Sequence, residues 1–335
     1  MILITGGLGF IGSNFVIDYC YINKEKIIIL DKMVYQSSML ILKKLKGITN
    51  VKIIHGDISN KRLVSEILEE YNPRAIINFA AETHVDTSIK SPRIFLETNV
   101  NGTFDLLEIT LKYWKNSSSL IKNKFKFIHI STDEVFGSLN KNDPSFEETS
   151  KYYPNNPYSA SKAGSEHFVR AFYKTYGLPV IITNCSNNYG PFQQSEKLIP
   201  NTIKCALSDK DIPIYGNGLN IRDWLYVGDH CLAITLLLDK GIVGESYNIG
   251  GNNETSNVEI IDLICSALDK LYPRLNKTSY KNLITFVEDR LGHDFRYSIN
   301  SQKIKNELSW KVSKSLEDGI FETVQWYVDN QDWFK

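Results

Sequence analysis

Apolar residues in the first 184 positions gather in short runs rich in isoleucine and valine, and most of these runs do not alternate with polar residues. An uninterrupted apolar run is typical of a strand that is buried on both faces of a parallel sheet. The runs predict buried strands at residues 2–5, 26–30, 51–55, 75–79, 125–131 and 179–184.

The segments between these runs predict helices. Ser59 or Asn60 can cap a helix that ends near Glu70, and Ser91-Pro92 resembles a cap followed by proline at the first helical position. Repeated strand–helix units imply right-handed crossovers between parallel strands. The predicted fold class is therefore α/β, with a doubly wound parallel (Rossmann) sheet.

The pattern changes after residue 184. Short strands are expected at 212–218, 224–227 and 246–249, and helices at 195–208, 227–239, 258–271 and 316–329. We expect a smaller α/β C-terminal domain that binds the substrate. The first domain is predicted to span 1–184, with 224–250 returning to it, and the second to span 185–223 and 251–335.

Composition excludes several classes of function. The chain has 335 residues, and its 38 Lys+Arg balance its 38 Asp+Glu, so no overall field attracts nucleic acid or an anionic membrane. The five cysteines form no CxxC pair and no metal-ligand spacing with the six histidines, which predicts free thiols in a reducing cytoplasm and no metal site. No apolar run approaches the ~18–20 residues that span a bilayer.

A glycine motif follows the first predicted strand and opens a helix. Gly6, Gly9 and Gly12 have the spacing G-x-x-G-x-x-G, which allows a tight turn and a close approach to a pyrophosphate. The helix N-terminus adds free N–H groups for the phosphates. Asp31 ends the second strand, where a carboxylate can bind the adenosine ribose and repel a 2′-phosphate. The pattern predicts a dinucleotide site that favours NAD over NADP.

Two further segments fit the same site. Asp57-Ile58 can flank the adenine, although Asp57 could equally cap a helix. Ala80-Ala81 supply small side chains where a cofactor would pass close to the backbone.

Tyr158 and Lys162 lie at i and i+4, on one face of a predicted helix. None of the other tyrosines among the 18 in the chain has a lysine four residues later. A phenol has a pKa near ~10 and is a poor base, but a nearby ammonium and the charge of nicotinamide both favour the phenolate. Tyr158 could then accept a proton from a substrate hydroxyl, and the alternative is a surface pair on an amphipathic helix.

Thr132, Asp133 and Glu134 follow another buried strand, at the edge of the sheet where such folds bind ligands. Thr132 could hold a sugar hydroxyl. Two neighbouring carboxyl groups tend to separate in pKa, so that one removes a proton and the other donates one. Neighbouring side chains of a strand face opposite ways, so the backbone must turn here. A capping box or solvated loop acids would explain the triplet without catalysis.

The chain resembles the nucleotide-sugar 4,6-dehydratases, a family of extended short-chain dehydrogenases/reductases, over nearly its whole length. The residues that carry the resemblance are the glycine motif at 5–12, Ala80-Ala81-Glu82-Thr83-His84-Val85-Asp86, Thr132-Asp133-Glu134-Val135-Phe136-Gly137, Tyr158-x3-Lys162, the segments at 185–191, 196–200 and 222–224, and Asp289-Arg290-Leu291-Gly292-His293-Asp294.

The resemblance implies a reaction and roles for five catalytic residues. The enzyme would oxidise C4 of dTDP- or UDP-glucose with NAD, eliminate water across C5 and C6, and return the hydride to C6. Tyr158 would be the base for C4 oxidation, supported by Lys162 and Thr132. Glu134 would remove the C5 proton, and Asp133 would protonate the departing C6 hydroxyl.

The resemblance also extends the expected binding sites. Arg222, Arg290 and His293 would hold the diphosphate and nucleoside, because a guanidinium donates bidentately to phosphate oxygens. The expected substrate contacts are His84, Thr132, Asn187, Glu196, Lys197, Leu198, Pro213, Tyr215, Arg222, Asn257, Arg290 and His293. The expected cofactor contacts are Gly6, Gly9, Phe10, Ile11, Gly12, Asp31, Lys32, Met33, Val34, Asp57, Ile58, Ala80, Ala81, Thr83, Thr98, Tyr158, Lys162 and Asn188.

Other readings of the sequence stay open. A 4-epimerase of the same fold needs the tyrosine, the lysine and a Ser or Thr but not the Asp-Glu pair, and a decarboxylase would need different groups around Thr132. A non-catalytic NAD-binding regulator would not need the reactive residues at all. The family resemblance further implies a cytoplasmic homodimer joined through the long helices that follow Ser91 and bear Tyr158. The sequence does not choose between dTDP and UDP.

Overall fold

The predicted parallel sheet is present and has seven strands. The computed structural model describes residues 1–34, 36–289 and 291–334. All neighbouring strands of this sheet pair in parallel. In spatial order they are β10 (Ser246–Ile249), β6 (Val180–Cys185), β5 (Lys126–Thr132), β4 (Ala75–Asn78), β1 (Ile2–Thr5), β2 (Ile27–Asp31) and β3 (Val51–His55).

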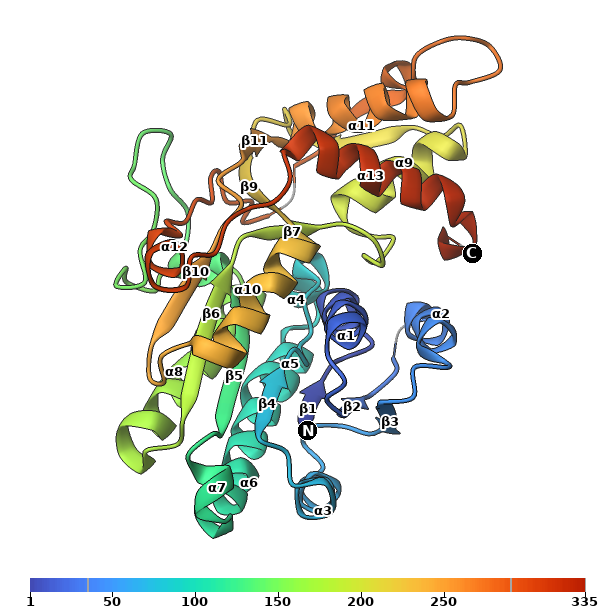
Figure 1. The fold of residues 1–335 in the computed structure, drawn as a ribbon. Coiled ribbons are helices and arrows are strands. Elements are labelled where there is room, and N and C mark those ends of the chain that lie inside the picture. The colour runs from blue at the N-terminus through green and yellow to red at the C-terminus, as the bar shows by residue number, and fades with distance from the viewer. Residues whose placement is uncertain (35, 290, 335) are drawn as a thin grey trace.

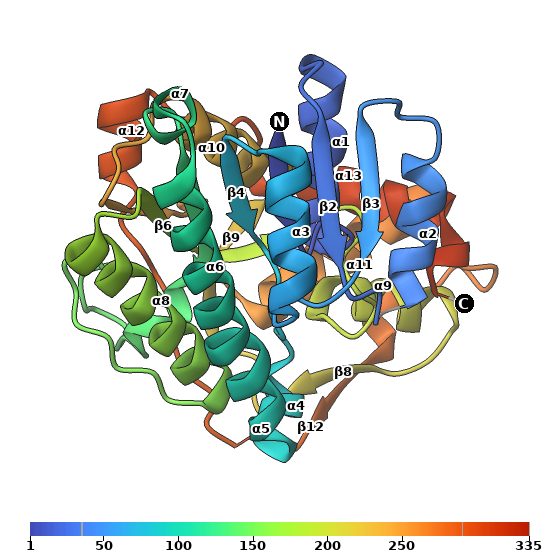
Figure 2. The same cartoon turned by 90° about the horizontal axis from the view of Figure 1, so that it is seen from below.

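Helices cover both faces of the sheet, as a doubly wound fold requires. Figure 2 shows α3, α6 and α8 side by side on the near face, where they close an apolar core with Leu3, Ile76 and Phe127. Helices α1, α10 and α12 cover the other face. The helices packed around the large sheet are α1 (Phe10–Ile22), α2 (Gln36–Leu45), α3 (Lys61–Tyr71), α6 (Thr103–Asn116), α7 (Ser119–Lys122), α8 (Pro157–Tyr176), α10 (Val227–Lys240) and α12 (Gln302–Leu308).

A second, smaller core lies at the carboxyl end of the sheet, where Figure 1 shows α9, α11 and α13 gathered together. Its helices are α9 (Leu198–Leu207), α11 (Asn257–Leu271) and α13 (Leu316–Asp329). Two small sheets complete it, one of β11 (Glu254–Ser256), β9 (Ile221–Tyr226) and β7 (Asn187–Tyr189), and one of β12 (Ile284–Val287) and β8 (Ile212–Tyr215).

The chain crosses between the two cores more than once. Segment α10–β10 returns to the large sheet. Ile304, Leu308 and Trp310 also pack in the core of the large sheet, although they lie inside the range 251–335 that we assign to the second domain. The reason is that α12 presents its apolar face to α10 and β10. The remaining domain boundaries stay a prediction.

The helical segment after Ser91 differs from the expectation. Ser91 does precede a helix with Pro92 at its start, α5 (Pro92–Phe95), but the Ser91 side chain makes no capping hydrogen bond. The helix then widens into a π-helix at Leu96–Gly102 before α6 continues it. Asn60, rather than Ser59, caps α3, because its side chain accepts a hydrogen bond from the backbone N–H of Leu63.

Within the described residues, no helix is both long enough and apolar enough to cross a membrane.

Candidate active site

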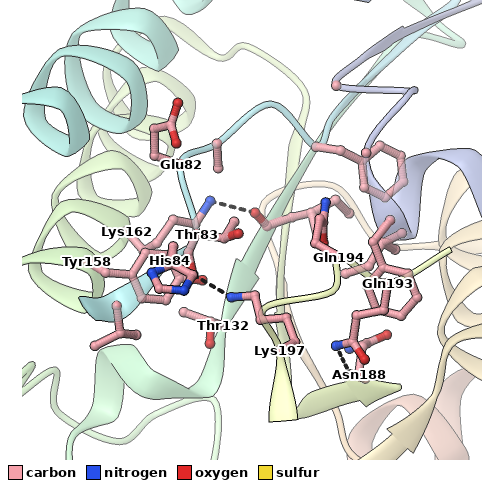
Figure 3. A pocket seen from close by; sticks show the side chains of 18 of the residues that line it. Glu82, Thr83, His84, Thr132, Tyr158, Lys162, Asn188, Gln193, Gln194 and Lys197 are labelled. Atoms are coloured by element: carbon pink, nitrogen blue, oxygen red, sulfur yellow. Dashed lines mark hydrogen bonds between the residues drawn. The ribbon is translucent and has the colours of Figure 1, made fainter. Parts of the chain in front are cut away.

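A cavity of about 450 Å³ opens at the carboxyl ends of the sheet strands and is also lined by residues of the smaller core. Residues just after β1, β2, β4, β5 and β6 all reach it, because parallel strands end at the same edge. Figure 3 shows Tyr158, Lys162 and Thr132 on one side of this cavity and Asn188 and Gln193 on the other.

Nearly all of the residues expected at the two binding sites line this single cavity. Met33 and Asp133 do not line it, and Arg290 lies outside the described residues. Those that line it are Gly6, Gly9, Phe10, Ile11, Gly12, Asp31, Lys32, Val34, Asp57, Ile58, Ala80, Ala81, Thr83, His84, Thr98, Thr132, Glu134, Tyr158, Lys162, Asn187, Asn188, Glu196, Lys197, Leu198, Pro213, Tyr215, Arg222, Asn257 and His293.

The glycine loop is built for close backbone contacts. Gly6 has a positive φ of 68°, and a Cβ added there would lie 2.7 Å from the backbone nitrogen of Ala80. A Cβ at Gly12 would lie 2.5 Å from the carbonyl oxygen of Gly6. These approaches leave no room for side chains, so the N-terminus of α1 is exposed to the cavity as a pyrophosphate site requires.

Asp31 is fixed at the end of β2 by two backbone hydrogen bonds. Its carboxylate accepts from the N–H of Leu8 at 2.8 Å and from the N–H of Met33 at 2.8 Å. Burial raises the pKa of Asp31, and the two N–H groups oppose that rise. Lys32 is paired with Asp57 at 2.9 Å. That pairing engages the positive charge that could otherwise attract a 2′-phosphate, so the geometry fits the ribose of NAD better than that of NADP.

We expect Gly12→Ala to weaken NAD binding by about tenfold or more, because the added methyl group forces the loop backbone apart and such overpacking typically costs 1–3 kcal/mol. Isothermal titration of the purified protein with NAD measures this directly. Gly164→Ala is the matched control, because its added Cβ would meet only Val100 at 3.4 Å. Equal affinity of Gly12→Ala and the wild type would contradict the assignment of the loop.

Tyr158 and Lys162 share one face of α8, but they do not interact as the sequence suggested. Lys162 donates to the carbonyl oxygen of Ile130 at 2.8 Å. Burial lowers the pKa of Lys162 to about 8. Burial also raises the pKa of Tyr158 well above its ordinary value, with the carboxyl of Glu134 adding to the rise. Burial therefore opposes the expected effect of the ammonium on the phenolate, and it is the largest influence on the pKa of Tyr158.

The backbone turns at the acidic pair, as the chemistry requires. Thr132 ends β5 in an extended conformation, and a 3₁₀ helix begins at Asp133. The Thr132 hydroxyl accepts from the N–H of Glu134 at 3.3 Å and donates to Asp133 at 3.3 Å. A hydrogen bond with the Thr132 hydroxyl also acts to lower the pKa of Tyr158. One threonine thus links the phenol to the Asp133 carboxyl group and to the backbone of Glu134.

The two carboxyl groups lie in different environments. Glu134 is half-buried and lines the cavity, whereas Asp133 is 2% exposed behind it. Burial, followed by the nearby charges of Glu134 and Asp223, raises the pKa of Asp133 well above its ordinary value. This rise favours the protonated form of Asp133, and its Oδ2 has no hydrogen-bond partner among the described residues.

The residues on the substrate side come from distant segments. The Lys197 ammonium donates to the carbonyl oxygen of Thr83 at 2.9 Å, and His84 caps α4 (Val85–Lys90) through the N–H of Thr87. Arg222 stacks over the ring of Tyr297 at 4.4 Å, and His293 contacts Asp289 at 2.6 Å.

Several residues in or behind the cavity wall were not expected from the sequence, and two of them, Asn99 and Glu166, lie behind the residues that line it. Asn99, on the π-helix, donates to the Ser161 hydroxyl at 2.8 Å and bonds both backbone groups of Glu82. Glu166 is fully buried beside Lys162. It lies two helical turns beyond Tyr158, on the same face of the helix, and this spacing in the sequence could have identified it. The unexpected residues that line the cavity are Leu30, Ser38, Gly56, Phe79, Glu82, Val85, Asp86, Ile130, Ser131, Cys185, Ser186, Gln193, Gln194, Asn201, Trp224 and Tyr297.

Comparison with known proteins gives consistent matches. The family model "GDP-mannose 4,6 dehydratase" matches residues 3–323. A dTDP-glucose 4,6-dehydratase from Xanthomonas campestris pv. campestris is 48% identical over 331 residues, which cover 99% of this chain and 94% of that protein.

Two solved structures are similar along the whole chain. A dTDP-glucose 4,6-dehydratase from Bacillus anthracis, crystallised with NAD, has a TM-score of 0.87 at 45% identity and covers 99% of this chain and 97% of its own. A UDP-glucose 4-epimerase from Thermotoga maritima has a TM-score of 0.85 at 27% identity and covers 98% and 99%. The fold is common to both, and the sequence is more similar to the dehydratase. By the extent of these matches, the chain belongs to the GDP-mannose 4,6 dehydratase family of nucleotide-sugar dehydratases.

Proposed function

We propose that the chain is an NAD-dependent dTDP-glucose 4,6-dehydratase, which converts dTDP-glucose to dTDP-4-keto-6-deoxyglucose and water. The observation that carries this proposal is the grouping of Tyr158, Thr132 and Glu134 in the cavity wall, with the buried Asp133 carboxyl hydrogen-bonded to Thr132 directly behind them. An epimerase has no use for the acidic pair. The names of the relatives support dTDP rather than UDP.

The residues present fit NAD. The pyrophosphate would lie on the loop from Gly6 to Gly12, and the adenosine ribose would lie against Asp31. When bound, NAD supplies the hydride acceptor for C4 and the hydride donor for C6.

The first step is proton removal from the C4 hydroxyl. Thr132 and Tyr158 line the same part of the cavity, so the threonine can orient this hydroxyl and the phenol oxygen can accept its proton. The positive charges of Lys162 and of the bound nicotinamide favour the phenolate at that moment. With the C4 hydrogen leaving as hydride, for which bound NAD would be the acceptor, a 4-keto group results, and it acidifies the C–H bond at C5.

The second step is elimination of water. Glu134 takes the proton from C5, the new double bond forms between C5 and C6, and the C6–O bond breaks. Asp133 gives its proton to the departing hydroxyl, which leaves as water. Burial raises the pKa of Asp133, which favours the protonated form that can donate here. The hydroxyl must approach the Asp133 carboxyl from the Glu134 side, since Asp133 itself does not line the cavity.

The nucleoside diphosphate would occupy the part of the cavity nearest the smaller core. We assign its contacts to His84, Asn187, Glu196, Lys197, Leu198, Pro213, Tyr215, Arg222, Asn257, Arg290 and His293. The charges of Arg222 and Lys197 at this end explain how a protein with no net charge can bind a dianionic ligand.

A direct assay tests the proposal. The purified protein, incubated with dTDP-glucose and NAD, should form a product whose 4-keto chromophore develops in alkali, and UDP-glucose in parallel should react more slowly. Release of dTDP-galactose would assign the chain to the epimerases instead. Absence of both products would refute the enzyme assignment.

We also propose that the protein is a cytoplasmic homodimer. All five cysteines are free, which suits a reducing compartment. Helices α6 and α8 lie side by side, and on their surface Phe168 is 40% exposed although its ring lies 5.2 Å from that of Phe104. Nearby Leu96 is 50% exposed and Ile94 is 45% exposed. Such an apolar patch fits a second copy of the chain.

We expect Phe168→Glu to dissociate the dimer, because the new carboxylate would be buried without a partner. Sedimentation velocity should then show a monomer, while the exposed Phe286, placed on β12, can be changed to glutamate without this effect. A wild type that sediments as a monomer would remove the proposal.

A further inference from the structure

Glu166 is a fully buried carboxylate that the proposed mechanism does not use. It is 1% exposed on α8, one helical turn beyond Lys162 and two beyond Tyr158. Its oxygens accept hydrogen bonds from the Ser131 hydroxyl, from the Tyr152 hydroxyl and from the Asn184 amide at 3.0 Å. Three donors around one buried carboxyl form a site that is built to hold a negative charge.

The donors of Glu166 belong to the segments that carry the reactive groups. Ser131 directly precedes Thr132 on β5. Asn184, on β6, also donates to the carbonyl oxygen of Thr132 at 3.1 Å. Glu166 therefore ties α8, which carries Tyr158, to the end of β5, where the chain turns toward the acidic pair.

The same carboxyl lies close enough to Lys162 to raise the pKa of that lysine against the effect of burial. Removing a charged ammonium from water costs several kcal/mol unless an opposite charge is near. Burial in turn raises the pKa of Glu166 to about 7, which its three donors and Lys162 oppose. Each member of the pair thus helps the other to remain ionised.

We propose that Glu166 is a positioning residue for the oxidation step, which holds the end of β5 in register with Tyr158 and keeps the ammonium of Lys162 charged. This inference rests on the proposed function, because it concerns the residues that take the proton from the C4 hydroxyl.

Other buried titratable groups near the pair have pKa values that burial shifts away from neutrality. His129 on β5 is fully buried, and burial lowers its pKa well below the ordinary value. Burial raises the pKa of Cys185 on β6 to about 12 and also raises the pKa values of Tyr152 and Tyr158. Arg170 on α8 acts on Tyr152 as a permanent cation, and the ring of the exposed His167 lies 5.1 Å from the Tyr152 ring. Glu166 and Lys162, with pKa values of about 7 and about 8, are the buried groups among these that lie near neutrality.

Glu166→Gln tests the electrostatic part of the proposal. Losing the carboxylate lowers the pKa of Lys162. In the plot of oxidation rate against pH, the alkaline limb, where the rate falls, should therefore move to lower pH by about one unit or more. The step is isolated in a Glu134→Gln background, where formation of reduced nicotinamide from dTDP-glucose can be followed without the elimination. Glu166→Asp is the matched control, because it disturbs packing but keeps the charge.

The outcomes separate the possibilities. A shifted limb in Glu166→Gln and an unshifted limb in Glu166→Asp support the proposal. Equal limbs in wild type and Glu166→Gln, or equal shifts in both variants, overturn it. Failure of the wild-type protein to form the 4-keto product refutes the proposed function instead, whereas failure of Glu134→Gln alone to form reduced nicotinamide means that Glu134 acts before the elimination.

A second measurement does not depend on activity. The ¹⁵N NMR signal of the Lys162 side chain, assigned by its loss in Lys162→Arg, can be titrated in the wild-type protein and in Glu166→Gln. The midpoint should lie at lower pH in Glu166→Gln, because the carboxylate that raises the pKa of Lys162 is gone. Equal midpoints would show that the carboxyl does not act on the ammonium and would overturn the proposal.

Discussion

Glu134→Gln is expected to stop turnover after oxidation, so that reduced nicotinamide accumulates while product formation falls about 10²- to 10⁴-fold. The amide has nearly the same shape as the carboxylate but cannot accept the C5 proton. Glu134 lines the cavity and Tyr158 is unchanged, so oxidation of C4 still proceeds. Stopped-flow absorbance of reduced nicotinamide and the alkaline assay of the 4-keto product together measure both effects.

Glu147→Gln provides the control for this experiment. Glu147 is exposed in the loop that precedes α8, so the same chemical change there should leave both signals at the wild-type level. If Glu134→Gln turns over as fast as the wild type, Glu134 has no part in the elimination. If neither oxidation nor elimination occurs, Glu134 acts earlier than proposed.

Tyr158→Phe is expected to abolish oxidation itself, with a loss of about 10²- to 10⁴-fold in the formation of reduced nicotinamide. The variant lacks the only atom of this side chain that can accept the C4 proton. The Tyr158 side chain is 8% exposed, and burial raises its pKa because the site disfavours a charge. Phenylalanine keeps the buried ring and carries no charge, so the substitution should not lower the free energy of unfolding. Thermal unfolding therefore checks that the loss is chemical.

The exposed neighbour Tyr153 gives the matched control, since it is 77% exposed and should tolerate phenylalanine. The two catalytic variants should differ in kind. Glu134→Gln accumulates reduced nicotinamide, whereas Tyr158→Phe forms none. Accumulation in Tyr158→Phe would mean that another group takes the C4 proton, and the role given to Tyr158 would fail.

Much of the fold followed from local pattern. Isoleucine-rich runs such as Ile27–Asp31 and Val180–Cys185 are strands of one parallel sheet, as expected, because strands buried on both faces need such runs. Helix α13 has the expected limits, with the Ser315 side chain accepting from Asp318 at its start. The short strands β7, β11 and β12 were not expected, because three or four residues are too few to show a period.

Most of the cavity was predictable as well. Parallel strands bring their carboxyl ends to one edge, so the glycine loop, Asp31, Ala80 and Thr132 had to meet once the topology was known. What spacing could not give is the electrostatic environment. A pKa depends on burial and on charges from other segments of the chain. The pKa values of Asp133, Tyr158 and Lys162 are each shifted mainly by burial.

The sequence by itself predicted the class of fold, the dinucleotide loop and the proposed reactive groups, because these predictions depend on residue types and on short spacings along the chain. The tertiary structure alone decided the electrostatic environment of those groups. The pKa of Asp133 is raised because it is buried beside Glu134 and Asp223, and Lys162 donates to the carbonyl oxygen of Ile130. Glu166 acquires its place only when β5, β6 and α8 converge, because its partners are far apart in the chain and adjacent in space.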